Sequence, residues 1–287
     1  MFGILASMLD GVLVGAVYGL AAIGLTLIWG VMDVINLTHG AMITLGMFAL
    51  YLIFVKTGIM PYAALVPVAV IGFGFGLAVY WTSVHRVITR PPLMSLLSTF
   101  AVNMVLIGLG TALWSTDLYN VNYSVPGVTV QGFTFTGNHI LAALAAALIA
   151  AGLFVFLQHT REGKAIRAVA SNRRAAELMG VPSTLVLSHA FALGIAIAAV
   201  SGALIATLFP FDVLKGSVYE LKSFVVCVLG GLGNPAGALM GGVLLGLIEG
   251  GVTPFIQVSW VPVIEFVLFV LILIAFPNGL FARGTRR

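Results

Sequence analysis

Long apolar segments alternate with short polar stretches along the 287 residues of this chain. A helix that crosses a bilayer needs about 20 apolar residues, and fewer when the helix is broken. The pattern predicts an all-α polytopic membrane protein, with 1–287 forming a single transmembrane domain. We expect about eight or nine segments, some of them discontinuous. They lie near 5–29, 41–55, 62–82, 93–115, 138–158, 184–208, 221–232, 236–253 and 260–276.

Two of these segments need comment. The first apolar run, Phe2 to Trp29, is longer than the apolar part of a signal peptide and has no basic residues before it, so we expect a first membrane span. The segment 221–232 is too short to cross alone. We expect it to form a discontinuous or re-entrant element with 236–253.

Composition supports the membrane assignment. The chain is 61% hydrophobic and 8% charged, whereas soluble domains carry roughly 25% charged residues. The net charge of +4 comes from the loops, and no basic stripe is interleaved with aromatic residues, so no nucleic-acid partner is expected. Cys227 is the only cysteine and allows no intrachain disulfide.

Basic residues are concentrated in three short stretches, which hold ten of the thirteen Lys and Arg residues. Cytoplasmic loops of membrane proteins carry an excess of Lys and Arg. The pattern therefore places 82–92, 159–183 and the C-terminus in the cytoplasm, and the N-terminus and 116–137 outside. The stretches contain Arg86 and Arg90; Arg161, Lys164, Arg167, Arg173 and Arg174; and Arg283, Arg286 and Arg287.

The three other basic residues, Lys56, Lys215 and Lys222, are expected near the outer ends of helices, where their ammonium groups can reach the interface. Glycines recur in steps of four within the first predicted span and within 236–253. Small residues at this spacing allow helices to approach closely in lipid. We therefore predict that these glycines pack helices together.

The apolar pattern is first interrupted at 30–40, where Asp33, Asn36, Thr38 and His39 lie between two glycines. Polar residues at membrane depth usually face a cavity or the protein interior. This stretch is either a broken-helix element or an ordinary cytoplasmic turn, and we favour the former because transporters place such breaks at their translocation sites.

The second interruption is Gly230-Gly231-Leu232-Gly233-Asn234-Pro235-Ala236-Gly237. It lacks the Gly-Lys-Ser/Thr ending and the βαβ setting of a phosphate-binding loop, so we expect no ATP binding. Two interrupted spans, one in each half of a chain, are typical of a transport site built from broken helices. We predict that Asp33, Asn36, His39, Gly230, Gly231 and Gly233 line the solute path, with Glu249 as a further candidate.

A third feature is the loop 159–183, where small residues recur at helical spacing with cations on the other side. We expect one surface helix, opened by Gly163 and stopped at Gly180. Its face lacks bulky apolar residues, which favours docking into a partner protein over resting on lipid headgroups. Buried acids are further candidates, since Glu249 and Glu265 lie inside apolar runs.

Four stretches together resemble the permease subunits of ABC importers for branched-chain amino acids. The resemblance covers nearly the whole chain, and the ordered set is more specific than any one stretch. They are 24–30 with 36–40, 161–168 through Gly180, 230–237, and Pro277-Asn278-Gly279-Leu280-Phe281.

The resemblance implies a bacterial inner-membrane permease without cofactor or catalytic site. Its partners would be separate ATP-binding cassette subunits, a second homologous permease or a second copy of itself, and an extracytoplasmic solute-binding protein. Alternating access would be driven by ATP on the partner subunits. The implied ATPase-coupling residues are Arg161, Gly163, Lys164, Ala165, Arg167, Ala168, Asn172, Ala176 and Gly180.

Departures from the family pattern at Ala41 and Asp33 leave the exact solute open, and short-chain amides or urea stay as alternatives. A stand-alone secondary transporter or channel would use the same breaks but no partner, and the loop 159–183 argues against it. An intramembrane enzyme would require paired acids or a His/acid pair at one depth. Nothing in the sequence places Glu249 beside His39.

Overall fold

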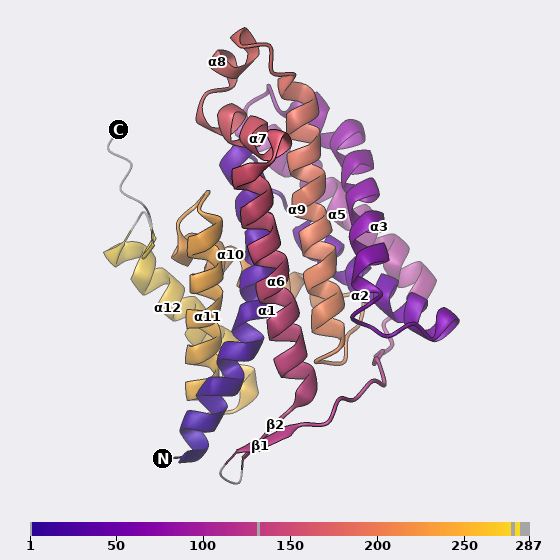
Figure 1. Cartoon of the computed structure of the whole chain (residues 1–287), viewed down its shortest axis with the longest axis vertical. Coiled ribbons are helices and arrows are strands. Elements are labelled where there is room, and N and C mark those ends of the chain that lie inside the picture. Colours follow the sequence, from indigo (N-terminus) through magenta and orange to yellow (C-terminus); the bar gives the residue numbers. More distant parts are fainter. Residues whose placement is uncertain (1, 131–132, 277–278, 282–287) are drawn as a thin grey trace.

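The computed structural model describes residues 2–130, 133–276 and 279–281, and Figure 1 shows a bundle of long helices. Among these residues, seven helices are long and apolar enough to cross a membrane, which confirms the predicted all-α polytopic fold. The long elements are α1 (Phe2–Met32), α2 (His39–Thr57), α3 (Leu65–Val79), α5 (Pro92–Trp114), α6 (Gly137–His159), α9 (Ser183–Ala206), α10 (Lys215–Gly230), α11 (Pro235–Val252) and α12 (Val261–Ala275).

The shorter elements complete the chain. A π-helical turn, Tyr80–Val84, and α4 (His85–Val87) extend α3 into one continuous helix. Strands β1 (Val128–Val130) and β2 (Phe133–Phe135) pair antiparallel, with Thr129 opposite Thr134. A 3₁₀ turn, Val258–Trp260, precedes α12.

The helix α10 is longer than the predicted segment 221–232, because it begins at Lys215. The polar residues of its first two turns interrupt the apolar run, but they belong to the helix. A four-residue connection from Gly231 to Asn234 joins α10 to α11, and the two helices form a hairpin.

The core of the bundle is formed by α1 and α9. In α9, 89% of the residues in its most apolar 18-residue stretch are buried. A helix that is buried on all sides is expected to be apolar on all sides, as α9 is. It packs against α1, α2 and α3. Gly194 of α9 meets Gly24 of α1 so closely that a methyl group on Gly24 would lie 2.5 Å from the Gly194 carbonyl oxygen.

The predicted glycine packing occurs between α1 and α11. A methyl group on Gly15 would lie 2.5 Å from the carbonyl oxygen of Gly242 and 3.0 Å from Cα of Gly246. Gly11 and Gly250 make similar backbone contacts along the same seam. Backbone therefore lies against backbone along the pair, as small residues four apart allow.

The helix α5 lies at the periphery, because only 17% of the residues in its most apolar 18-residue stretch are buried. Its buried residues are polar or small, including Ser95, Thr99 and Asn103. The Thr99 hydroxyl lies 3.2 Å from the Leu37 backbone nitrogen, which donates to it, and 3.1 Å from the Ile35 carbonyl oxygen. This helix is thus attached to the rest of the chain by its polar face.

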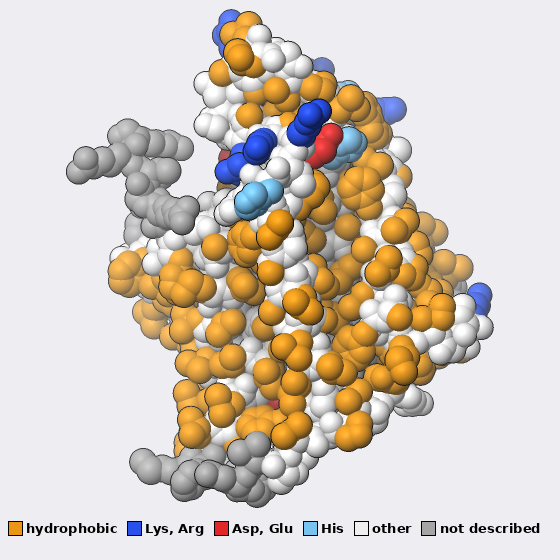
Figure 2. Space-filling view, in the orientation of Figure 1, with side chains coloured by type: hydrophobic (Ala, Val, Ile, Leu, Met, Phe, Trp, Pro, Cys, Tyr) orange, Lys and Arg blue, Asp and Glu red, His pale blue; other side chains and the backbone are white. Residues whose placement is uncertain are grey.

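Polar features are divided between the two ends of the bundle. The helices α7 (Arg161–Ser171) and α8 (Arg173–Leu178) lie at one end, and the N-terminus and the β1–β2 hairpin lie at the other (Figure 1). On the face that Figure 2 shows, hydrophobic side chains cover most of the length of the bundle, and most of the visible Lys and Arg side chains lie at the α7–α8 end. The predicted basic residues Arg283, Arg286 and Arg287, and Pro277 and Asn278, lie outside the described residues.

The prediction of one continuous helix across 161–180 is wrong. The chain is helical over α7 and α8 but breaks at Asn172, whose backbone is extended (φ −158°, ψ 101°). The Asn172 side-chain oxygen accepts a hydrogen bond from the Ala175 backbone nitrogen at 2.9 Å, so Asn172 starts a second helix instead of continuing the first. The first helix begins at Arg161, where Thr160 caps it, and not at Gly163.

Candidate functional site

The first interruption is a genuine break in the helical path. The helix α1 ends at Met32, and Asp33 adopts a left-handed conformation with φ 53°. The next helix, α2, begins at His39. Between them, the side-chain oxygen of Asn36 accepts hydrogen bonds from the backbone nitrogen of Thr38, at 3.1 Å, and from the Thr38 hydroxyl. Asn36 thus holds the non-helical segment in shape with one end of its amide.

The second interruption is a tight glycine turn. Gly231 and Gly233 have φ values of 87° and 78°, which a residue with a Cβ adopts only with strain. The C-terminal stretch packs on this turn. The Asn234 amide nitrogen donates to the Phe281 carbonyl oxygen at 2.9 Å, and the Leu280 backbone nitrogen donates to the Leu229 carbonyl oxygen at 2.9 Å.

The two breaks meet in space although they are far apart in the sequence. A methyl group built on Gly30 would lie 2.8 Å from Cα of Gly233. No side chain therefore separates the two backbones at this point. The structure brings together the two segments that the sequence pattern singled out.

A cavity of about 410 Å³ lies beside this meeting point. Its volume is within the range of small-molecule sites, roughly 300–1,000 Å³. The first break contributes 35–37, the second break contributes Leu232, and α1, α5 and α10 supply the other walls. The lining residues are Leu25, Trp29, Ile35, Asn36, Leu37, Leu96, Ser217, Glu220, Leu221, Phe224, Cys227 and Leu232.

The cavity walls are mostly apolar, and their polar atoms come from few residues. Two of the lining residues each have a side-chain atom that is buried without a hydrogen-bond partner among the described residues: Nδ2 of Asn36 and Oε1 of Glu220. The other carboxylate oxygen of Glu220 lies against the first turn of α2, where a methyl group on Gly40 would lie 2.7 Å from it. An amide donor and a carboxylate acceptor thus line the same cavity.

Glu220 was not predicted as a site residue, because 209–220 reads as a loop in the hydropathy pattern. The signal is present as a helical spacing. Ser217, Glu220, Phe224 and Cys227 recur at steps of three and four, and all four line the cavity from α10. Extending the helix to Lys215 would have placed Glu220 on this face.

Of the predicted path residues, Asn36 lines the cavity, and the others do not: Asp33, His39, Gly230, Gly231, Gly233 and Glu249. Asp33 is exposed and does not line the cavity. His39 is fully buried, with Nε2 3.0 Å from the Ala21 carbonyl oxygen, so its ring packs on α1. Glu249 of α11 is not among the lining residues, and it contacts Lys222. Of the predicted glycines, Gly230 packs on Gly237 of α11, and Gly231 packs on Gly279.

Lys222 does not lie at the outer end of a helix, so that prediction is wrong. Its ammonium nitrogen lies 2.8 Å from Oε2 of Glu249 and 2.8 Å from Oε1 of Glu265. The same nitrogen lies 4.6 Å from the ring centre of Tyr18. A buried lysine between two carboxylates is electrostatically satisfied where it stands, so it does not need to reach the interface. We call Lys222, Glu249 and Glu265 the ion cluster.

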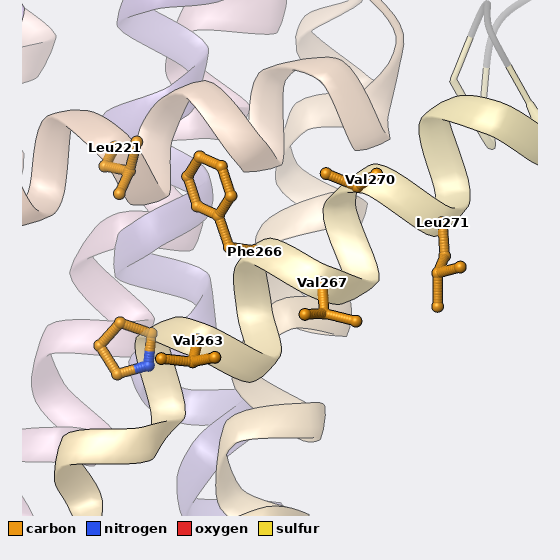
Figure 3. Close-up of a pocket in the computed structure, with 7 residues that line it drawn as sticks. Leu221, Val263, Phe266, Val267, Val270 and Leu271 are labelled. Atoms are coloured by element: carbon orange, nitrogen blue, oxygen red, sulfur yellow. The ribbon is translucent and has the colours of Figure 1, made fainter.

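A separate apolar groove of about 550 Å³ lies between α10 and α12 (Figure 3). Leu221 borders it from α10, and Phe266 of α12 points toward that helix. The remaining lining residues are Pro262, Val263, Val267, Val270 and Leu271. The absence of polar side chains from this lining is typical of a surface covered by lipid or by another apolar face.

The helix α7 is anchored to the bundle by one face. Gly163, Ile166 and Val169 are buried, and a methyl group on Gly163 would lie 2.5 Å from Cα of Leu157. The predicted coupling residues are divided by this packing. Ala165 is half-buried and Ala176 of α8 is buried, whereas the others listed here are exposed: Arg161, Lys164, Arg167, Ala168, Asn172 and Gly180.

The tip of α8 exposes two apolar side chains, with Leu178 at 83% and Met179 at 84% of their full accessible surface. Glu177 fixes the base of this tip by bonding to the Ser183 hydroxyl and to Arg173, whose Nε is 3.1 Å from Oε1. The hydrogen bond from Ser183, followed by the one from Arg173, lowers the pKa of Glu177. The base of the tip is therefore held in place, and the tip presents apolar surface at the end of the bundle where α7 also lies (Figure 1).

Among the described residues, no group of three or more His, Cys, Asp or Glu side chains is arranged to hold a metal ion.

Residues 7–276 match the protein family described as "Branched-chain amino acid transport system / permease component". None of the solved protein structures matches the chain.

Curated relatives resemble the chain over most of its length. The "High-affinity branched-chain amino acid transport system permease protein LivH" of Salmonella typhimurium is 29% identical, covering 97% of this chain and 96% of that protein. The permease protein BraD of Pseudomonas aeruginosa, which carries the same description, is 27% identical over the same shares. A "Probable branched-chain amino acid transport permease protein LivH" of Methanocaldococcus jannaschii is 26% identical over 91% of this chain and 87% of that protein.

Proposed function

The chain belongs to the family of permease components of branched-chain amino acid transport systems, and from that premise we propose that it forms the membrane path of an ABC importer for branched-chain amino acids. The observation that carries the proposal is the cavity between the two breaks. It combines apolar walls, which suit a branched aliphatic side chain, with an amide and a carboxylate, which suit the charged groups of an amino acid. The chain itself performs no chemistry in this scheme.

A second permease, homologous or identical, completes the path. Leu221 and Leu232 at the edge of the cavity are exposed, so the cavity is open on one side of this chain. Polar groups that line such an opening would face lipid if nothing covered it, and that is costly. A second subunit on this side encloses the path and excludes lipid from Asn36 and Glu220.

Separate ATPase subunits supply the energy through α7 and α8. The docking surface consists of the exposed cations Arg161, Lys164 and Arg167 of α7 and the exposed Leu178 and Met179 at the tip of α8. Closure of the ATPases on ATP moves this surface, and the anchored face of α7 passes the movement to α6, α9 and α1, which it contacts. The two conformations differ in their contacts with the partner, and this difference drives alternating access.

Orientation follows from the charges. The α7–α8 end faces the cytoplasm of a bacterial cell, and the N-terminus and the β1–β2 hairpin face outward across the inner membrane. An extracytoplasmic binding protein delivers the solute at the hairpin end. The C-terminus is cytoplasmic. The affinity for solute resides in that binding protein, so the path itself binds weakly.

The path is tested by cysteine labelling in a Cys227→Ala background. Ser217→Cys, in the cavity, should react with a small water-soluble thiol reagent, and L-leucine should protect it. Leu148→Cys, exposed on the outer side of α6, serves as the lipid-facing control and should stay unlabelled. Absence of labelling at Ser217→Cys in every nucleotide state would contradict the proposed path.

The coupling surface is tested with Ala168→Trp. This exposed position on α7 has no room for an indole if an ATPase docks there, so leucine-stimulated ATP hydrolysis should be lost while the permease still inserts. Leu148→Trp is the matched control, because it adds the same side chain on a membrane-facing surface. Unchanged transport in Ala168→Trp would contradict docking at α7.

A further inference from the structure

We propose that Glu220 binds the α-ammonium group of the amino acid in the path, and that Asn36 donates a hydrogen bond to its carboxylate. The inference rests on the proposed function and specifies which part of the solute the cavity recognises. The ligand class is an α-amino acid with both charged groups free and an apolar side chain.

Glu220 lacks a cationic partner. It makes no ion pair with any Lys, Arg or His in the described residues, and its Oε1 is buried without a hydrogen bond. Lys222 is only two residues away, but it is engaged by Glu249 and Glu265 on another face of α10. A buried carboxylate is costly unless it is paired. Glu220 is among the residues that line the cavity, so a cation bound in the cavity would lie beside this carboxylate.

Asn36 supplies a donor for the other charged group. It is 2% exposed, and its side-chain oxygen is already used by Thr38. Its Nδ2 is left without a partner, and Asn36 is among the residues that line the cavity. Asn36 is therefore fixed by one end of its amide, so that the nitrogen has a defined position. Ser217 does not compete for this role, because its hydroxyl donates to the Leu214 carbonyl oxygen at 2.7 Å.

The remaining walls accommodate the side chain. Leu25, Phe224 and Leu232 come from three different segments and present hydrocarbon to the same space. An acceptor, a donor and an apolar surface together match the three parts of leucine, isoleucine or valine. Neutral solutes such as urea or short-chain amides leave the Glu220 carboxylate uncompensated. The arrangement thus disfavours the neutral solutes that the sequence left open.

The test separates the charged groups of the ligand. In the complete transporter without its binding protein, protection of Ser217→Cys is measured with L-leucine, with leucinamide, which keeps the ammonium group, and with 4-methylpentanoate, which lacks it. With Glu220 intact, L-leucine and leucinamide should protect at concentrations at least tenfold lower than 4-methylpentanoate. Glu220→Gln should raise the protecting concentration of L-leucine and leucinamide about tenfold and leave that of 4-methylpentanoate unchanged or lower.

A conservative variant and the result with Glu220 intact keep the outcomes distinct. Glu220→Asp keeps the charge on a shorter side chain, so it should retain the preference for ammonium-bearing ligands. If Glu220→Gln does not assemble, the ligand preference is measured in Glu220→Asp instead. Equal protection of all three ligands with Glu220 intact, or protection by L-leucine that is unchanged in Glu220→Gln, would overturn the role of Glu220 alone. Failure of L-leucine to protect Ser217→Cys with Glu220 intact would overturn the proposed path, and this assignment with it.

Discussion

Replacing Lys222 by methionine should destabilise the chain by about 3–5 kcal/mol, the usual cost of removing one partner from a buried ion pair. Lys222 is the only cation in the ion cluster among the described residues, and it contacts both carboxylates. Methionine preserves most of the side-chain volume and removes the charge. Glu249 and Glu265 are then left next to each other without a counter-ion.

The magnitude follows from distance and burial. At 2.8 Å and an effective dielectric constant of about 20, each Lys222–carboxylate pair gains roughly 6 kcal/mol of Coulomb energy before desolvation is subtracted. The Glu265 side chain is 6% exposed and the Glu249 side chain is 26% exposed, so water replaces the lost attraction better at Glu249. Most of the expected loss therefore comes from Glu265.

Replacing a carboxylate of the ion cluster instead of the lysine should reduce stability only slightly. Glu265→Gln removes one of two carboxylates and leaves Lys222 paired with Glu249, so the cluster keeps a balanced pair. The double variant Lys222→Met with Glu265→Gln should lie between the two single variants, since only the more exposed Glu249 is left unpaired. The asymmetry arises because an unpaired buried charge costs more than an absent pair.

The assay is survival of the monodisperse detergent-solubilised protein after heating, read by fluorescence-detected size exclusion. Lys222→Met should lose the monodisperse peak at a clearly lower temperature than Glu265→Gln. Equal survival of Lys222→Met and the parent, or a larger loss in Glu265→Gln than in Lys222→Met, would refute the reasoning. The second result would mean that the carboxylates, not the lysine, hold α12 in place.

Three further predictions concern packing and the α7–α8 end. Gly15→Leu should abolish folded protein, because even a methyl group at Gly15 would lie 2.5 Å from the Gly242 carbonyl oxygen. Gly74→Leu should be tolerated, because a methyl group at Gly74 would have nothing within 4 Å. Equal size-exclusion yields of the two variants would contradict this prediction. Asn172→Ala should destabilise α8 by about 1 kcal/mol and speed hydrogen exchange of its amides about fivefold, unlike Asn172→Asp. Ser183→Ala should raise the lowered pKa of Glu177, as read by NMR of labelled carboxyl carbons. Because the folded-state pKa is lowered, the stabilising contribution of Glu177 is present above the unfolded-state pKa and is lost as the pH falls through the folded-state value. In Ser183→Ala this loss should be complete at a higher pH, and an identical titration in both proteins would count against the hydrogen bond.

The sequence was sufficient where a feature depended on local pattern. Apolar length predicted the helices, and glycines four residues apart predicted close packing, although not that Gly15 would meet Gly242. The two breaks could be located because a cluster of glycines and a run of polar residues interrupt an apolar pattern. That they would touch at Gly30 and Gly233 is a tertiary fact that no local pattern contains.

The errors have one physical cause, which is that a polar residue's partner decides its place. Lys222 was expected at the interface because a lone lysine in lipid is costly, but two acids from α11 and α12 compensate its charge. Glu220 was overlooked because its helix was expected to begin later. The break at Asn172 was missed because its side chain caps a second helix, while the small-residue spacing across it still reads as one continuous helix.

The seam between α1 and α11 has a consequence for how the chain is made. The Ser7 hydroxyl donates to the Gly250 carbonyl oxygen at 2.7 Å, across 243 residues of sequence. At about 5–20 residues per second, the ribosome needs roughly 12–50 s to synthesise that interval. The glycine face of α1 therefore enters the bilayer long before its partner exists. During that time its exposed backbone is covered by lipid or by another protein, and assembly of the finished bundle requires that this temporary neighbour be displaced by the penultimate helix.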